Sequence, residues 1–311
     1  MSAPVSTSPA ERPPAGGAAQ ALPGDDDPAP LSAATRLAVA ALLLLFAGLA
    51  TWGAWTKSET YDEPMYIFTA YSYVVTGDLS LNKEHPPLAK YLMGLPLLAL
   101  DVVLPADHQR KPGLPMAFIA HQPRADHHLM LFLPRLPGIA LGVLLGLYVF
   151  AWSRRAFGTA AGLASLSLYA LNPNMLGHAR VAANDFAVTL FCCATLYHVW
   201  RWLEAERRAR GRGPGEGAAW RQLGLGTLML GGALGCKLTS LLMLPVLGLL
   251  VLAAAVAWRR PALLGRAALA LLAAFGLLYL MYGGEARRQA RNPSSSSRLK
   301  ASGFLNSHDT T

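Results

Sequence analysis

Long apolar runs, separated by short polar connections, are the feature that most constrains how this sequence can fold. Only 14% of the 311 residues are charged, whereas about a quarter are charged in a soluble globular domain. A helix needs about 20 mainly apolar residues to cross the core of a bilayer. We therefore expect an all-α, polytopic transmembrane helical bundle of about seven spans. The predicted spans are Leu37–Trp55, Leu136–Trp152, Thr159–Leu171, Asp185–Trp202, Leu223–Cys236, Leu238–Trp258 and Ala262–Tyr282.

The two ends of the chain differ in composition from this apolar part. Residues 1–35 are rich in Pro, Ala, Gly and Ser, and residues 284–311 include four consecutive serines. Neither segment has an apolar pattern that could offset the entropy of ordering it. The sequence therefore predicts disordered tails at both ends and one transmembrane domain over residues 36–283.

The arginines between the runs predict how the bundle is oriented. By the positive-inside rule, Arg154-Arg155, the loop Arg201–Arg221 and Arg259-Arg260 face the cytoplasm. The loop after the first span, the turn Asn172–Asn184 and Lys237 then share the opposite face. The basic C-terminal tail also falls on that face, so either the span count is off by one or the tail is atypical. Polar residues from three connections gather on one side, which predicts a site there.

Several other features predict no site. The net charge of +9 does not indicate nucleic-acid binding, because the arginines lie mainly between apolar segments. The three cysteines lie inside apolar segments and form no CxxC pair, so we expect neither a disulfide framework nor a zinc site. The polar residues Pro105–Arg135 predict a long loop, and its four histidines have no spacing typical of metal ligands.

The connection Thr60–Lys90 carries an unusual set of ionisable residues, which begins with Asp62-Glu63. A carboxylate beside an apolar helix can serve as a general base or bind a divalent metal. Acidic residues also favour helix N-termini, so the pair could simply cap the helix that follows. The aromatic segment Pro64–Val75 predicts a helix that lies on the membrane surface.

A second group in this connection is Glu84-His85-Pro86-Pro87, followed by Lys90. The prolines suit the first turn of a helix, and we expect Leu88–Leu104 to be interfacial or re-entrant. Lys90 could reach the membrane surface and bind a lipid phosphate there, or it could merely extend its amine to the interface. The second interpretation explains the prolines and Lys90, but it gives Glu84 and His85 no role.

A third group, His178, Arg180 and Asp185, interrupts the apolar pattern between two spans. Arg180 and Asn184 share a face if this segment is helical, and a guanidinium is a good phosphate ligand. Asp185 either caps the next span or has a function. Lys237 follows a glycine-rich stretch, and it either neutralises a phosphate or ends a helix.

Four segments together resemble the polytopic glycosyltransferases of the GT-C type. The resemblance is closest to the dolichyl-phosphate-mannose protein mannosyltransferases and the bacterial aminoarabinose lipid A transferases, and it covers roughly residues 37–282. The segments are YDEPMY at Tyr61–Tyr66, EHPPLAKYL at Glu84–Leu92, NPNMLGHARVAANDFAVTLF at Asn172–Phe191 and GALGCKLTSLLMLP at Gly232–Pro245.

The resemblance implies inverting transfer of a sugar from a polyprenyl-phosphate donor to a protein or a lipid or glycan acceptor. It gives Asp62 the role of base or acceptor ligand, and it implies that Glu63 and His85 shape that site. The predicted ligands of the donor phosphate or substrate are Lys90, Arg180, Asp185 and Lys237. No cofactor is identified, and a requirement for a divalent metal stays open.

We thus expect a multi-pass enzyme of a bacterial-type plasma membrane, with its site facing outward. Its expected partners are the donor, the acceptor and membrane lipids. Members of the family usually continue with further spans, so a shortened copy is also expected. Two alternatives stay open, a non-catalytic remnant of the family and a polytopic transporter or lipid-binding protein. Transporters often contain internal repeats, and this sequence shows none.

Overall fold

The fold is a bundle of α-helices, seen in a computed structural model that describes residues 30–105, 114–208 and 216–283. No β-strand occurs in these ranges, so the predicted all-α class is confirmed. The helices are α1 (Ala33–Thr56), α2 (Glu63–Thr76), α3 (Leu88–Gly94), η1 (Leu95–Ala99), α4 (Leu114–Ala120), α5 (His127–Phe157), α6 (Thr159–Ala170), α7 (Pro173–Ala179), α8 (Asp185–Arg208), α9 (Glu216–Cys236), η2 (Leu238–Leu242), α10 (Met243–Ala257) and α11 (Ala262–Met281).

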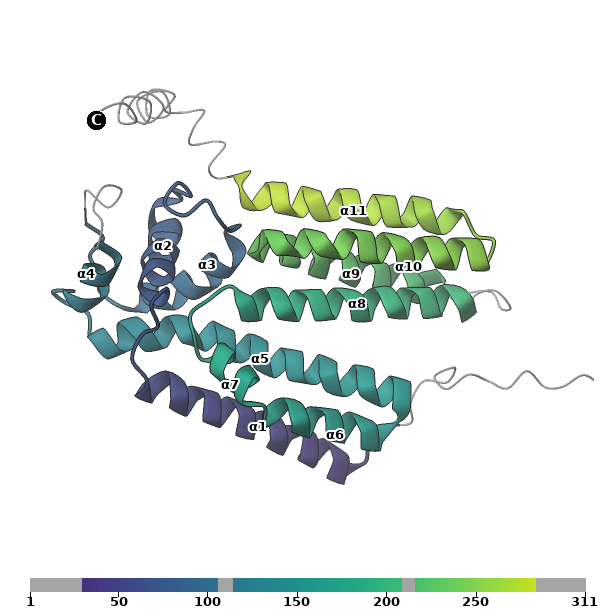
Figure 1. Ribbon diagram of the computed structural model, residues 1–311, viewed down its shortest axis with the longest axis horizontal. Coiled ribbons are helices and arrows are strands. Elements are labelled where there is room, and N and C mark those ends of the chain that lie inside the picture. The colour runs from purple at the N-terminus through teal and green to yellow at the C-terminus, as the bar shows by residue number, and fades with distance from the viewer. Residues whose placement is uncertain (1–29, 106–113, 209–215, 284–311) are drawn as a thin grey trace, which may run out of the picture.

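The long helices run side by side, and the short helices α2, α3 and α4 gather at one end of the bundle (Figure 1). We call this the loop end; the turn between α7 and α8 also lies there. The opposite end holds the turns between α5 and α6 and between α10 and α11, and we call it the arginine end. The three arginine-rich connections predicted to face the cytoplasm therefore start or lie at one end of the bundle.

Five helical segments are long and apolar enough to cross a membrane: α1, α5, α8, η2 with α10, and α11. The predicted span at α6 is shorter, with 12 residues. The predicted span at α9 is a 21-residue helix, but it is not among those five. The polytopic character is confirmed, while the number of seven spans stays a prediction.

Helix α5 differs most from the sequence-based expectation. The Asp126 side chain accepts a hydrogen bond from the Leu129 amide and starts the helix at His127, nine residues before the predicted Leu136. Pro134 and Pro137 lie inside the helix, which membrane helices tolerate because neighbouring groups satisfy the freed carbonyls. The predicted loop over Pro105–Arg135 is therefore wrong over its last nine residues. It is also wrong at α4.

Two further expectations about local structure can be compared with the fold. The predicted helix over Pro64–Val75 is present as α2, and its position at the membrane surface stays a prediction. Residues 181–184 are not helical, since α7 ends at Ala179 and α8 begins at Asp185. The condition under which Arg180 and Asn184 would share a helix face is therefore not met. The expected tails lie almost wholly outside the described residues, although α1 already begins at Ala33.

Candidate active site

A cavity of about 400 Å³ lies at the loop end, where the connection into α2 meets the segment from α7 to α8. Its walls come from the start of α2, from α7, and from the segment that leads into α8. Of the predicted site residues, four line this cavity directly. The full lining is Thr60, Asp62, Glu63, Tyr66, Pro173, Asn174, Gly177, His178, Arg180, Val181, Ala183 and Asp185.

Asp62 precedes the first residue of α2 and is exposed. Its carboxylate makes no capping hydrogen bond to the helix, although Asp is a favoured capping residue. The backbone of Asp62 is already helical, with φ −89° and ψ −20°, and this differs from the extended backbone of a typical N-cap residue. The Asp62 carboxylate is thus available to the cavity and is not used by the fold.

Glu63, the next residue, has the opposite environment, because its side chain is fully buried against Arg135 of α5. The Arg135 Nε donates to Glu63 Oε1 and a terminal nitrogen donates to Glu63 Oε2, both at 2.8 Å. The amides of Ala182 and Thr60 also donate to this carboxylate, at 2.9 and 2.8 Å. Burial alone raises the pKa of Glu63, but these hydrogen bonds outweigh it and hold the pKa below its ordinary value.

Arg135 uses its whole guanidinium in this arrangement. Besides the two bonds to Glu63, it donates to the carbonyls of Ala54, Lys57 and Ser58 at 2.7, 2.8 and 3.0 Å. An arginine side chain has five N–H donors, and all five are used. The pair therefore connects the end of α1, the start of α2, the N-terminal third of α5 and the turn before α8. It fixes the backbone next to Asp62.

Arg180 follows α7, and its side chain lies against Gly53 of α1. A Cβ atom at Gly53 would come within 2.8 Å of Arg180 Cδ and 3.0 Å of a terminal guanidinium nitrogen. Among the described residues, the Arg180 guanidinium has no hydrogen-bond or ion-pair partner. The cavity therefore presents one unpaired cation and, at Asp62, one unpaired carboxylate.

Asp185 and Lys237 form an ion pair at the edge of the cavity. Lys237 Nζ donates to Asp185 Oδ1 at 2.6 Å. The pair joins the start of α8 to the end of α9, and half of the Asp185 side chain is exposed. Lys237 does not line the cavity. Its ammonium group lies close to the cavity because it is paired with Asp185, which does line it. A pair this exposed can exchange partners when an anion binds, because water screens it.

His85 lies behind Tyr66, not in the cavity wall. The two rings are stacked, with centroids 6.5 Å apart. Burial and the charges of Lys237 and Lys90 lower the pKa of His85, so we expect a neutral imidazole near pH 7. Burial and the nearby acids Asp185, Asp62 and Glu84 raise the pKa of Tyr66, which keeps its hydroxyl protonated. Tyr66 is therefore the residue through which His85 contacts the cavity.

Lys90 is the predicted residue whose surroundings differ most from the expectation. Its side chain is fully buried, and Nζ donates to the Asn82 carbonyl, the Asn82 side chain and the His85 carbonyl at 3.0, 3.0 and 3.1 Å. The expectation that Lys90 reaches the membrane surface is wrong, because these acceptors hold its amine inside the loop. Lys90 does not line the cavity.

Sequence reasoning missed some residues of this site. Tyr66 and Asn174 line the cavity, and each lies inside a segment that carries the family resemblance; His178, named in the third group, lines it as well. Arg135 could not be assigned, because its partner Glu63 lies 72 residues away in the sequence. In the described ranges no three His, Cys, Asp or Glu side chains are grouped closely enough to hold a metal ion. The question of a metal stays open.

Comparison with known proteins gives the fold a family context. Residues 131–281 match the family model described as dolichyl-phosphate-mannose-protein mannosyltransferase. The resemblance to the GT-C mannosyltransferase-like family is confirmed. The matched range includes Arg135, Arg180, Asp185 and Lys237, whereas Asp62 lies before it. No curated protein matches the chain significantly.

A solved structure with this GT-C fold is the protein O-mannosyltransferase Pmt1-Pmt2 complex of S. cerevisiae bound to the sugar donor. The TM-score is 0.57, the sequence identity is 21%, and the match covers 81% of this chain. At this identity the likeness shows the fold alone. The chain spans about a third of the length of that yeast chain, with 33% covered.

Proposed function

We propose that this protein is a membrane glycosyltransferase that moves a sugar from a polyprenyl-phosphate donor to a hydroxyl of a protein or a lipid or glycan acceptor. One observation carries the proposal. The cavity at the loop end combines an unpaired carboxylate, Asp62, with an unpaired guanidinium, Arg180. A base and an anion-binding group are what transfer from a phosphate leaving group to a hydroxyl requires.

In the proposed reaction the acceptor oxygen bonds to the anomeric carbon while the bond from that carbon to the phosphate oxygen breaks. Asp62 takes the proton of the acceptor hydroxyl, and the electron pair leaves with the polyprenyl phosphate. The acceptor attacks from the side opposite the phosphate, so the anomeric configuration inverts. Tyr66 and His85 shape the wall beside Asp62, and Glu63 holds the backbone through Arg135.

The leaving phosphate gains charge as the bond breaks, so a fixed cation nearby lowers the barrier. Arg180 suits this role because its planar guanidinium can donate two hydrogen bonds to one phosphate group. Lys237 adds a second cation when the phosphate replaces Asp185 as its partner. We place Asp62 on the non-cytoplasmic side of a plasma membrane, because the arginine-rich connections lie at the other end of the bundle.

The decisive experiment compares Asp62→Asn with wild type in nanodiscs, with polyprenyl-phosphate mannose as the donor and with hydroxyl-bearing peptides and lipids as acceptors. Loss of a general base typically slows a reaction by about 100-fold or more. We expect that loss of transfer rate in Asp62→Asn and none in Glu59→Gln, which changes a neighbouring acid outside the cavity. Unchanged transfer in Asp62→Asn would remove Asp62 from the mechanism. Donor binding without transfer would favour a remnant or a transporter.

A second variant tests Arg180 without altering Arg180 itself. In Gly53→Ala the new Cβ displaces the Arg180 side chain, because it would lie 2.8 Å from Cδ. We expect donor KM to rise about tenfold, equivalent to about 1.4 kcal/mol. The control is Gly48→Ala in the same helix, where a Cβ meets no atom within 4 Å. Equal KM values in both variants would contradict the role of Arg180.

A further inference from the structure

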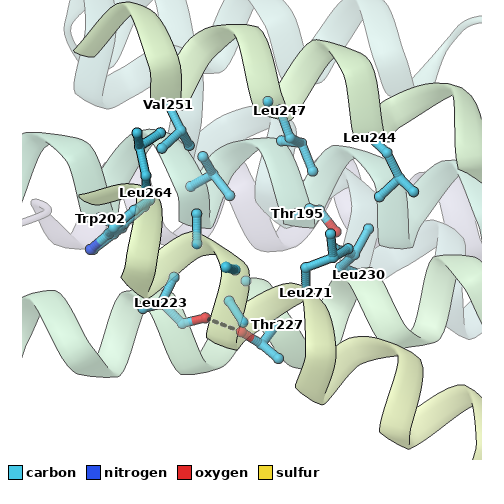
Figure 2. A pocket seen from close by; sticks show the side chains of 16 residues that line it. Thr195, Trp202, Leu223, Thr227, Leu230, Leu244, Leu247, Val251, Leu264 and Leu271 are labelled. Carbon is cyan, nitrogen blue, oxygen red and sulfur yellow. Dashed lines mark hydrogen bonds between the residues drawn. The ribbon is translucent and has the colours of Figure 1, made fainter. Parts of the chain in front are cut away.

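A second cavity, of about 180 Å³, lies between α8, α9, α10 and α11. Figure 2 shows side chains from these helices converging on it, with Trp202 and Leu264 toward one end and Thr195 and Leu244 toward the other. Several lining positions on α10 and α11, including Gly248, Leu264 and Ala268, are exposed at the bundle surface. The cavity is thus open at the side of the bundle formed by α10 and α11.

The walls of this cavity offer almost no hydrogen-bonding group. Its two hydroxyls, from Thr195 and Thr227, each donate to a carbonyl of their own helix, at 2.7 and 2.8 Å. The other lining side chains are aliphatic, apart from the Trp202 ring. An apolar cavity of about this size stays dry. Its natural occupant is therefore a hydrocarbon chain.

The cavity ends at a cluster of charged residues. The Trp202 indole lines the cavity and donates to Glu206 Oε1 at 3.2 Å. The same buried carboxylate is paired with two arginines, Arg260 at 3.2 Å and Arg266 at closer range. Two cations share one anion, so the cluster carries an excess positive charge. The exposed Arg259 adds to it.

This cluster is far from the candidate active site. Asp185 begins α8 and Glu206 lies near its end. At 1.5 Å of rise per residue, the 21 steps between them correspond to about 30 Å. The apolar cavity and its arginines therefore belong to the arginine end, where anionic lipids of the cytoplasmic leaflet attract basic groups.

We propose that this cavity binds one acyl chain of an anionic phospholipid, with the lipid phosphate on the arginines around Glu206. The excess positive charge favours an anionic headgroup over a zwitterionic one, and a guanidinium holds the phosphate through paired hydrogen bonds. The apolar cavity holds the chain by van der Waals packing, because the hydrophobic effect does not act between a lipid tail and an apolar wall inside the membrane. The bound lipid fastens α10 and α11 to α8 and α9 at the end opposite the catalytic loops.

The test measures lipid binding and is independent of sugar transfer. The full chain, purified in non-ionic detergent, is incubated with phosphatidylglycerol or phosphatidylcholine, and native mass spectrometry counts the retained lipid. We expect wild type to retain phosphatidylglycerol preferentially. Gly248→Leu fills the cavity from a position with no atom within 4 Å of the new Cβ, and it should weaken this retention at least about tenfold. Gly265→Leu, also unobstructed but outside the cavity, should retain the lipid.

Arg266→Gln separates the contribution of the charge from that of the cavity. It leaves Arg260 to pair with Glu206, and it should remove the preference for phosphatidylglycerol over phosphatidylcholine. Should Gly248→Leu fail to fold, Ala268→Leu fills the same cavity from α11. Equal retention of the two lipids by wild type would overturn the proposal. So would displacement of phosphatidylglycerol by equimolar polyprenyl phosphate, which would assign the cavity to the tail of the sugar donor.

Discussion

Asp62 and Glu63 are neighbours with different environments, and the geometry of the helix start explains the difference. Successive residues of a helix point about 100° apart, since a turn holds 3.6 residues. One carboxylate therefore faces the cavity while the next faces α5. The buried carboxylate accepts two hydrogen bonds from Arg135 and two from backbone amides, and the exposed carboxylate keeps its lone pairs for a ligand. An acid pair of this kind can combine a positioning residue with a catalytic one.

The first prediction concerns the stability of the buried pair. Glu63→Gln leaves the Arg135 guanidinium buried without its counter-charge. Removing one partner of a buried ion pair typically costs about 3–5 kcal/mol, and we expect a loss of that order in the free energy of unfolding. Unfolding in mixed micelles measures it, with Glu59→Gln as the control. Wild-type stability in Glu63→Gln would show that the pair does not hold the loop end together.

The same pair predicts how stability depends on pH. The pKa of Glu63 is held below its ordinary value of 4.5, so the folded state prefers the ionised carboxylate. The stabilisation is fully present above about pH 4.5 and is lost as the pH falls through the folded-state pKa. The melting temperature of wild type should therefore fall more steeply than that of Glu63→Gln below pH 4.5. Parallel curves for the two proteins would contradict this.

Sequence reasoning predicted this region in part. The acid pair, its position before a helix and its place at the same end of the bundle as Arg180 and Asp185 follow from composition and topology. The division of roles between Asp62 and Glu63 does not, because it depends on Arg135. An arginine between two prolines suggests a loop, whereas here it lies within α5 and contacts α1 and α2.

At the scale of elements, Lys90 holds the connection between α2 and α3 in place. The family resemblance implied a different role for this lysine, as a ligand of the donor phosphate. Lys90, on α3, holds residues 82–85 through three hydrogen bonds, and its amine lies 5.2 Å from the Tyr73 ring centre of α2. Burial lowers the pKa of Lys90 to about 8. The lysine therefore connects two helices and the loop between them, and this places His85 behind Tyr66.

The second prediction tests that role. Lys90→Met removes three hydrogen bonds from a charged donor, each worth about 1.5–3 kcal/mol. We expect amide hydrogen exchange over residues 79–87 to accelerate at least about tenfold. Lys83→Met changes an exposed lysine of the same connection and should leave exchange unchanged. Unchanged exchange in Lys90→Met with a raised donor KM would instead assign Lys90 to the phosphate.

At the scale of the whole molecule, successive long helices run in opposite directions, and this brings the three polar connections to one end of the bundle. The sequence predicts this gathering because each apolar run crosses the membrane once, so that alternate connections lie on the same side. The arginines in the connections predict which side faces the cytoplasm. The start of α5 could not be predicted, since Asp126 as a cap and prolines inside the helix override the local pattern, whereas the start of α8 at Asp185 was predicted. The cavity volumes depend on side-chain packing between helices distant in sequence, which no local pattern reveals.

The last prediction concerns the side of the membrane on which Asp62 lies. In a protein without its native cysteines, Glu59→Cys places a thiol at the loop end, and Arg207→Cys places one at the arginine end. Because basic connections stay in the cytoplasm, an impermeant maleimide should label Glu59→Cys in intact cells. It should label Arg207→Cys only after permeabilisation. The reverse pattern would place Asp62 in the cytoplasm and exclude transfer on the outer face. It would also move the phospholipid cavity to the outer leaflet, so one labelling experiment tests the orientation on which both sites depend.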